Sequence, residues 1–135
     1  MVVKEVMTKD PVSADVSSTV GEDIGTLSEL DVRHVPIVED GALVGIVSDR
    51  DVRGLFDPSM ADLDAPGRSD RLKRRVSEIM NTDVISVTEE TELSEVVDLM
   101  LDHRVGALPV VAPDSSLLVG IVSYMDVLRA AQSSL

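Results

Sequence analysis

The clearest pattern in the chain is an apolar run that occurs twice, each time followed by a polar turn. The copies span residues 43–52 and 118–127, and both read Leu-Val-Gly-Ile-Val-Ser-x-x-Asp-Val. A short apolar run rich in β-branched residues predicts a buried strand, and the serine after it can cap a helix through its hydroxyl. The aspartate three residues later can accept a hydrogen bond from the N–H of that serine. Each copy therefore predicts a strand, a turn and a helix start.

The segments before this run also occur twice, 73 residues apart. An apolar residue and a methionine open each repeat, at Met7 and Met80, and a short strand is expected soon afterwards, at 12–14 and at 84–87. The shared order indicates an internal duplication that covers most of the chain.

An amphipathic helix is expected after each short strand. In the second repeat, apolar residues recur at helical spacing from position 93 to position 100, and Thr91 is a candidate N-cap. In the first repeat, Thr19 and Glu22 have the spacing of a capping box. Gly21 and Gly25 weaken this first helix by about 1 kcal/mol each.

Two strands and a final helix complete each repeat. The first of these strands contains Pro36 or Pro109, which we expect at its first position, where a sheet tolerates proline. Asp40-Gly41 forms the hairpin turn of the first repeat. The order β-α-β-β-α in each repeat predicts an α+β fold. We expect repeat one at 1–60, a polar linker at 61–73 and repeat two at 74–135.

The composition excludes several kinds of site. The chain has 135 residues and no cysteine, so it holds neither disulfides nor thiolate metal sites, and its two histidines are too few for a histidine-based metal cluster. It has no apolar run of about 18 residues and no signal-peptide layout at its N-terminus. We therefore expect a cytoplasmic protein without a membrane segment.

The charge balance argues against nucleic acid as a partner. The net charge of −13 repels phosphates over most of the surface, and one Phe with one Tyr cannot build a stacking platform. A basic run at 71–75 is best interpreted as a solvated charge run, and phosphate contact is the alternative. Abundant Asp with scarce Lys is typical of salt-loving microbes, although an acidic protein of ordinary habitat is the simpler interpretation.

The tandem pattern resembles a pair of cystathionine-β-synthase (CBS) domains, a Bateman module. The resemblance is carried by the Gly-Ile-Val-Ser-x-x-Asp segments, by the segment 105–111 with its Val-x-x-x-Pro-hydrophobic-Val pattern, and by the apolar-Met openings. It implies two repeats packed about a pseudo-two-fold axis, with two clefts between them. It also implies an adenosyl ligand, which is AMP, ADP, ATP or S-adenosylmethionine, a homodimer, and an effector protein that remains unknown.

The resemblance also implies which residues line the two clefts. In the family, the Asp of the strand-helix motif holds the ribose, and the opening strand and the segment before the proline hold the adenine. One cleft would use Thr8, Ser13, Val32, Arg33 and His34 with Ser123 and Asp126. The other would use Asn81, Ser86, Val105, Gly106 and Ala107 with Ser48 and Asp51.

The residue chemistry allows this interpretation without requiring it. Arg33, His34 and Arg50 could hold a phosphate, whereas the Gly106-Ala107 cleft suits a less charged ligand or none. Arg33 could equally form a surface ion pair, and the Ser–Asp pairs could serve only as helix caps.

Three classes of function follow from the sequence. The first is a non-catalytic regulatory module that binds an adenosyl ligand and needs no further cofactor. The second is a dimerisation or docking module whose clefts stay empty. The third, an enzyme, is disfavoured because the sequence shows no nucleophile–base set and no P-loop.

Overall fold

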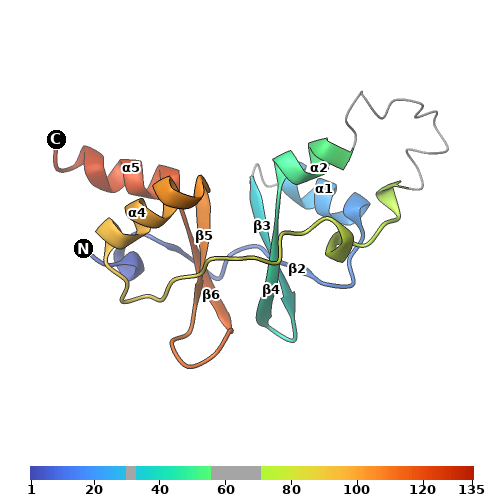
Figure 1. The fold of residues 1–135 in the computed structure, drawn as a ribbon, viewed down its shortest axis with the longest axis horizontal. Helices are drawn as coiled ribbons and strands as arrows, with labels where there is room; N and C mark the ends of the chain where they lie inside the picture. The colour runs from blue at the N-terminus through green and yellow to red at the C-terminus, as the bar shows by residue number, and fades with distance from the viewer. Residues whose placement is uncertain (30–32, 56–70) are drawn as a thin grey trace. The chain divides into compact units, whose positions relative to one another are not determined.

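The computed structural model describes residues 1–29, 33–55 and 71–135, and these form two compact units (Figure 1). Unit 1 contains residues 1–11, 41–43 and 84–135, and unit 2 contains residues 12–40 and 44–83. Each unit has a three-stranded sheet and two α-helices among its described residues. The α+β fold expected from the sequence is confirmed.

Unit 2 is built on the sheet β2-β3-β4. Its elements are β2 (Ala14–Asp15), α1 (Val20–Glu29), β3 (His34–Glu39), β4 (Ala42–Ser48), α2 (Asp49–Leu55) and the 3₁₀ turn η3 (Val76–Glu78). The short strand β2 runs parallel to β3, with Ala14 opposite Ile37. Helix α1 packs against β3 and α2.

Unit 1 repeats this plan on the sheet β1-β6-β5. Its elements are the 3₁₀ turn η1 (Val3–Glu5), β1 (Thr8–Lys9), α4 (Leu93–His103), β5 (Ala107–Val111), β6 (Leu118–Ser123) and α5 (Tyr124–Gln132). Strand β6 pairs antiparallel with both β1 and β5. Val87 forms a parallel bridge to Val110, which is the counterpart of the pairing of β2 with β3.

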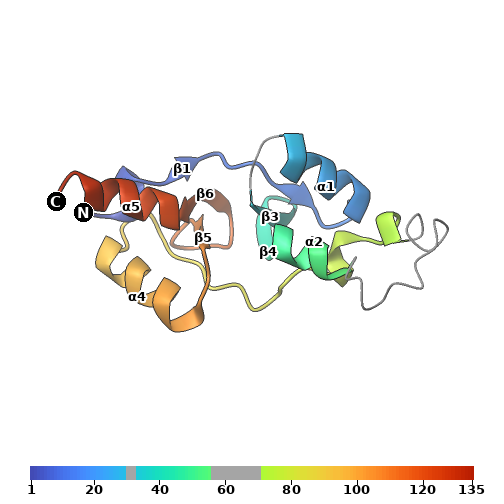
Figure 2. The ribbon, with the colours of Figure 1, turned by 90° about the horizontal axis from the view of Figure 1, so that it is seen from above.

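The two repeats exchange their opening segments. Thr8, from the opening of repeat one, pairs with Ile121 of repeat two, and Figure 2 shows β1 beside β6 in unit 1. Asn81, from the opening of repeat two, pairs with Ile46 of repeat one through reciprocal backbone hydrogen bonds of 2.9 and 3.1 Å. The compact units therefore divide the chain differently from the expected sequence division into 1–60, 61–73 and 74–135.

A glycine makes room for each exchanged segment. A Cβ atom built on Gly45 would lie 2.5 Å from Sδ of Met80 and 3.2 Å from the carbonyl oxygen of Asn81. A Cβ atom on Gly120 would lie 2.8 Å from Sδ of Met7 and 2.9 Å from the carbonyl oxygen of Thr8. The glycine of the repeated motif is thus needed because another part of the chain lies against the strand there.

Each unit has its own hydrophobic core, to which the exchanged segment contributes. Val76 is fully buried in the core of unit 2, and Val3 is fully buried in that of unit 1. The other buried members of the unit 2 core are Val35, Ile37, Val47 and Val52. Those of the unit 1 core are Val87, Val96, Met100, Leu108, Val110 and Val122.

One core position of the first repeat is polar. Asp23 on α1 is 1 % exposed, and it is the buried charged residue among those described. Its counterpart 73 residues later is Val96, which lies in the core of unit 1. The two repeats therefore differ in polarity at an equivalent, fully enclosed place.

Several local predictions are confirmed and others are wrong. The capping box of α1 is present, with the Glu22 N–H donating to Oγ1 of Thr19 at 3.3 Å. Thr91 does not cap α4, because its hydroxyl accepts the N–H of Thr88 and the N-cap position is Glu92. The strand expected at 12–14 is observed at Ala14–Asp15, and of the strand expected at 84–87 only the bridge of Val87 forms.

The expected place of the prolines was also wrong. Pro36 and Pro109 are the third residues of β3 and β5, not the first. The carbonyl of Pro109 accepts the N–H of Val87, and Val111 donates to Val87 in turn. Pro109 therefore has its missing N–H on the edge of β5 that faces Val87. Val87 forms only an isolated bridge there, so the proline interrupts no continuous ladder of hydrogen bonds.

We predict that Gly45→Val destabilises the protein by about 1–3 kcal/mol, because the added side chain displaces Met80 and the neighbouring Asn81, which is bridged to β4. Urea denaturation measures this change. Gly25→Ala is the matched control, because a Cβ at Gly25 meets nothing within 4 Å and the helix gains from the substitution. Equal effects of the two substitutions would contradict the explanation.

Candidate functional site

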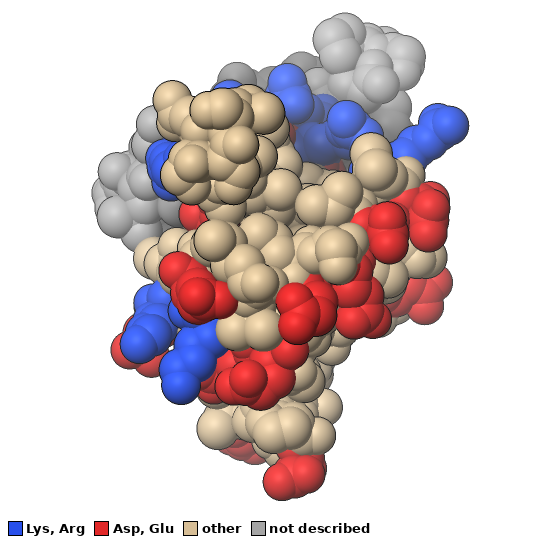
Figure 3. All heavy atoms as spheres, turned by 90° about the vertical axis from the view of Figure 1, so that its left-hand side faces the viewer, with Lys and Arg blue, Asp and Glu red and all other residues tan. Residues whose placement is uncertain are grey.

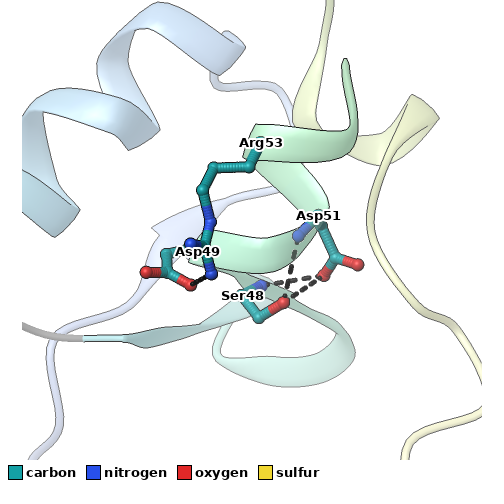
Figure 4. Close-up of polar contacts among 4 residues, drawn as sticks. All are labelled: Ser48, Asp49, Asp51 and Arg53. Carbon is teal, nitrogen blue, oxygen red and sulfur yellow. Dashed lines mark hydrogen bonds and ion pairs between the residues drawn. The ribbon is translucent and has the colours of Figure 1, made fainter. Parts of the chain in front are cut away.

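The strand-to-helix turn of unit 2 is closed by Ser48 and Asp51 (Figure 4). The N–H and hydroxyl of Ser48 donate to Oδ2 of Asp51 at 2.8 and 3.0 Å, and the Asp51 N–H donates to Oγ of Ser48 at 3.2 Å. Arg53 forms an ion pair with Asp49 at 3.2 Å on the same helix. Serine and aspartate thus form the capping box expected from their spacing.

The turn of unit 1 has the same geometry. The N–H and hydroxyl of Ser123 donate to Oδ2 of Asp126 at 2.8 and 3.1 Å, and the Asp126 N–H donates back at 3.4 Å. Oδ1 of Asp126 lies 3.7 Å from Nη1 of Arg129, an ion pair that the sequence analysis missed. The spacing of three residues on a helix could have indicated it.

These contacts leave part of each carboxylate for a ligand. A carboxylate has two oxygens and about four acceptor sites, and the cap uses Oδ2 alone. The hydrogen bonds that the described residues make to the Asp51 side chain all end on Oδ2. Capping and ribose binding are therefore compatible at one side chain.

Arg33 and His34 stand at the strand start that meets the turn of unit 2. The carbonyl oxygen of Arg33 accepts the N–H of Asp49 at 3.0 Å, so the start of β3 lies against the start of α2. Burial lowers the pKa of His34 from its ordinary value of 6.5, with Asp49 and Asp51 acting in the opposite direction and Arg33 adding to the lowering. Both the acids and Arg33 are therefore close enough to His34 for their charges to matter.

The turn of unit 1 has small residues at the matching positions. The carbonyl oxygen of Gly106 accepts the N–H of Tyr124 at 2.9 Å, which is the counterpart of the contact between Arg33 and Asp49. Ala107 is buried and stands opposite Ser123 in the sheet. The structure thus reproduces the backbone arrangement of unit 2 without the guanidinium and imidazole groups.

The structure groups the predicted residues by unit. Unit 2 brings Ser48, Asp51, Arg33, His34 and the backbone of Asn81 to one end of its sheet. Unit 1 brings Ser123, Asp126, Gly106, Ala107 and Thr8 to the corresponding end. The two implied clefts combine residues of both units and stay a prediction.

The remaining predicted residues are placed as follows. Ser13 and Ser86 are exposed, each just before the short parallel contact of its repeat. Arg50 is exposed on the first turn of α2, and Val105 is half-buried before β5. Val32 lies outside the described residues.

The described surface agrees with the acidic composition. On the face drawn in Figure 3, acidic side chains spread across the middle and basic side chains gather at the edges. Glu95, Asp98 and Asp102 are exposed on α4. The described residues contain no group of three metal-ligating side chains, and none of the described helices has the length and hydropathy to cross a membrane.

A comparison with known protein families identifies the two repeats. The model of the CBS domain matches residues 3–57 and again residues 76–133. The chain belongs to the CBS domain family. The two matches are the two repeats recognised in the sequence, so the resemblance to a tandem CBS pair is confirmed.

Relatives of known structure carry the same fold. The CBS domain pair of protein MJ0100, solved in complex with 5′-methylthioadenosine and S-adenosyl-L-methionine, is 26% identical, with a TM-score of 0.85 over 100% of this chain and 98% of that one. CBSX2, solved in complex with AMP, is 29% identical, with a TM-score of 0.82 over 98% of this chain and 96% of that one. CBS pairs similar to this one thus bind adenosyl compounds.

The proteins related to this chain by sequence differ in the share of their own length that the chain matches. The CBS domain-containing protein YhcV of Bacillus subtilis is 32% identical over 92% of this chain and 81% of its own length. The inosine-5′-monophosphate dehydrogenase of Methanocaldococcus jannaschii is 31% identical over 93% of this chain, which spans only 22% of that enzyme. The enzyme is therefore matched over a minor part of its length.

We predict that Ser48→Ala and Ser123→Ala each lower the free energy of unfolding by about 1 kcal/mol, because each removes a cap acceptor and a donor to the aspartate. Urea denaturation measures the loss. Ser94→Ala, at an exposed position inside α4, is the matched control and is expected to be neutral or slightly stabilising. If all three variants behave alike, the serines do not act as caps.

We predict that His34 makes stability depend on pH. Because burial lowers the pKa of His34, the unfolded chain binds the proton more readily than the folded protein. The contribution of His34 to the free energy of unfolding is complete above its pKa in the unfolded chain, about 6.5. It is lost as the pH falls through the lower pKa of His34 in the folded protein. Denaturation of the native protein and of His34→Gln across this range measures it, and parallel profiles would show that His34 is not responsible.

Proposed function

We propose that the protein is a non-catalytic regulatory module that binds an adenosyl ligand, AMP, ADP, ATP or S-adenosylmethionine, and signals its presence to a partner protein. The observation that supports this most directly is the retention of the Ser–Asp turn in both repeats, each with a carboxylate only partly used by its cap. The complexes of MJ0100 and CBSX2 with adenosyl compounds support the choice of ligand.

The binding residues proposed are those around the two turns. A backbone N–H and carbonyl can read the edge of adenine, and the acceptor sites that the caps leave open on Asp51 and Asp126 suit the two ribose hydroxyls, with Oδ1 of Asp126 shared with Arg129. Arg33 and His34 would favour a ligand that carries phosphate, whereas Gly106 and Ala107 at the matching positions would favour one that carries none. Two sites of different charge preference would let the module respond to the ratio of two adenosyl compounds.

The proposed form is a homodimer. Apolar side chains are exposed on α5, at Tyr124 (41 %) and Leu128 (57 %), and on α4 at Leu101 (71 %). Exposed apolar surface of this kind is common where protein chains associate. The alternative function, a docking module without a ligand, needs the same surface and differs in leaving the two turns unused.

Thermal unfolding with each ligand at about 1 mM tests the proposal. A ligand at 100 times its Kd adds about 2.7 kcal/mol of stability, which is a shift of several degrees. We expect at least one adenosyl compound to raise the unfolding temperature of the native protein. The rise should be smaller in Asp51→Ala or Asp126→Ala. Arg33→Ala should lose the response to AMP and keep the response to 5′-methylthioadenosine. The shift within each variant is compared, so that changes in intrinsic stability cancel.

Thr19→Ala is the matched control, because it removes a helix cap outside the proposed site. It is expected to lower the unfolding temperature without changing the shift produced by ligand. If none of the compounds shifts the native protein at low or at molar salt, the adenosyl proposal fails and the docking module is favoured.

A further inference from the structure

The side chain of Asp23 is enclosed without partners. It is 1 % exposed, and neither carboxylate oxygen has a hydrogen-bond donor within reach among the described residues. Its backbone N–H donates to the carbonyl of Thr19, so the helix itself is intact there. Burying a polar group without a hydrogen bond lowers the free energy of unfolding, by about several kcal/mol if the group is charged and by less if it is neutral.

The internal duplication shows what this position normally holds. Val96 occupies the equivalent place on α4, is fully buried, and packs in the core of unit 1. Helices α1 and α4 begin at equivalent residues, Val20 and Leu93, and both contribute apolar side chains to the core over a sheet of the same design. Asp23 is therefore a carboxyl group in a place that the fold builds for an aliphatic side chain.

None of the ion pairs among the described residues involves Asp23. The elements packed against α1 are α2, β3 and the segment 71–75. Arg53 is engaged with Asp49, and Arg74 with Glu78. The other charged groups on these elements and on the start of α1 are Glu22, His34, Glu39, Arg50, Asp51, Arg71, Lys73 and Arg75.

Arg71 belongs to the segment packed against α1 and has an unused side-chain donor. Its Nη1 atom is buried and without a partner, and the next residue, Leu72, places its carbonyl oxygen 3.2 Å from where a Cβ of Gly21 would lie. Leu72 thus lies against the first turn of α1, and no ion pair among the described residues joins Arg71 to Asp23. Burial correspondingly raises the pKa of Asp23 from 3.8 to about 6.

We propose that Asp23 is a proton-sensitive switch in unit 2. With the carboxyl group neutral, α1 packs on its sheet as α4 does in unit 1. When Asp23 ionises, the carboxylate must reach water or Arg71, and α1 loosens from β3 and from the segment 71–75. That segment leads through the buried Val76 to Asn81, which pairs with β4 just before the Ser48–Asp51 turn. Ionisation therefore weakens the part of unit 2 that carries the turn.

The direction of the effect follows from proton linkage. The folded protein holds a proton on Asp23 at pH values where the unfolded chain has already lost it. The stabilising contribution is complete below the unfolded value of 3.8 and is lost as the pH rises to about 6. This direction is opposite to that of His34, so the two groups can be separated by substitution.

The test compares the native chain with Asp23→Val between pH 4.5 and pH 8 by thermal unfolding. We expect Asp23→Val to be the more stable protein, with a gap that widens by about 5 °C or more as the pH rises. Amide hydrogen exchange locates the change, and protection of α1 should fall with rising pH in the native chain only. A constant gap across the range would overturn the proposal.

Two further variants keep the result interpretable. Val96→Asp transfers the same group to unit 1 and should impose the same pH dependence there, with loss of protection in α4. Arg71→Met removes the neighbouring cation and should leave the pH dependence of the native chain in place. If Arg71→Met instead destabilises the protein and introduces the pH dependence anew, Asp23 is ion-paired in solution and the switch does not exist.

Discussion

The structure depends on one reciprocal contact, in which each repeat lends its opening segment to the other. Ile46 and Asn81 exchange backbone hydrogen bonds, Met80 lies against Gly45, and Val76 completes a core that the first repeat cannot fill alone. The second repeat receives Thr8, Met7 and Val3 in the same way. Without this contact each sheet would lose strand-edge hydrogen bonds, and each core would lose a buried valine.

The Ser–Asp turns illustrate how one pair of residues can serve two purposes. Their hydrogen bonds are those of a capping box, and this alone would explain why serine and aspartate stand at that spacing. The same cap holds the carboxylate in a single orientation beside a helix start, with acceptor sites to spare. Helix capping thus supplies the rigidity that a ligand site needs, and the local stability of the turn and its proposed use are not alternatives.

The features that could be predicted from the sequence are those with local causes. The α1 capping box and the two Ser–Asp caps each join residues three apart. The duplicated motif is visible as a direct repeat, and the family comparison confirms the tandem CBS pair. The exchange of openings joins residues far apart in the chain, so the local pattern around Met7 or Met80 does not indicate it. Only the family resemblance implied that Thr8 lies near the Ser123–Asp126 turn and Asn81 near the Ser48–Asp51 turn. Thr91 failed as a cap because Thr88 offered its hydroxyl a competing N–H at 3.1 Å. Arg33 and Asp49 meet only because β3 and α2 begin at the same end of the sheet.

The exchanged openings also bear on how such a chain could arise. A single repeat folding by itself would have an empty place in its core and an unpaired strand edge, and a second copy of the same repeat is the molecule that fits both. Two identical single repeats that exchange their openings would meet both needs. Joining the two copies in one gene makes the partner permanent, because the tether replaces a concentration-dependent encounter with an intramolecular one. It also frees the copies to diverge, as the positions of Asp23 and Val96 already have.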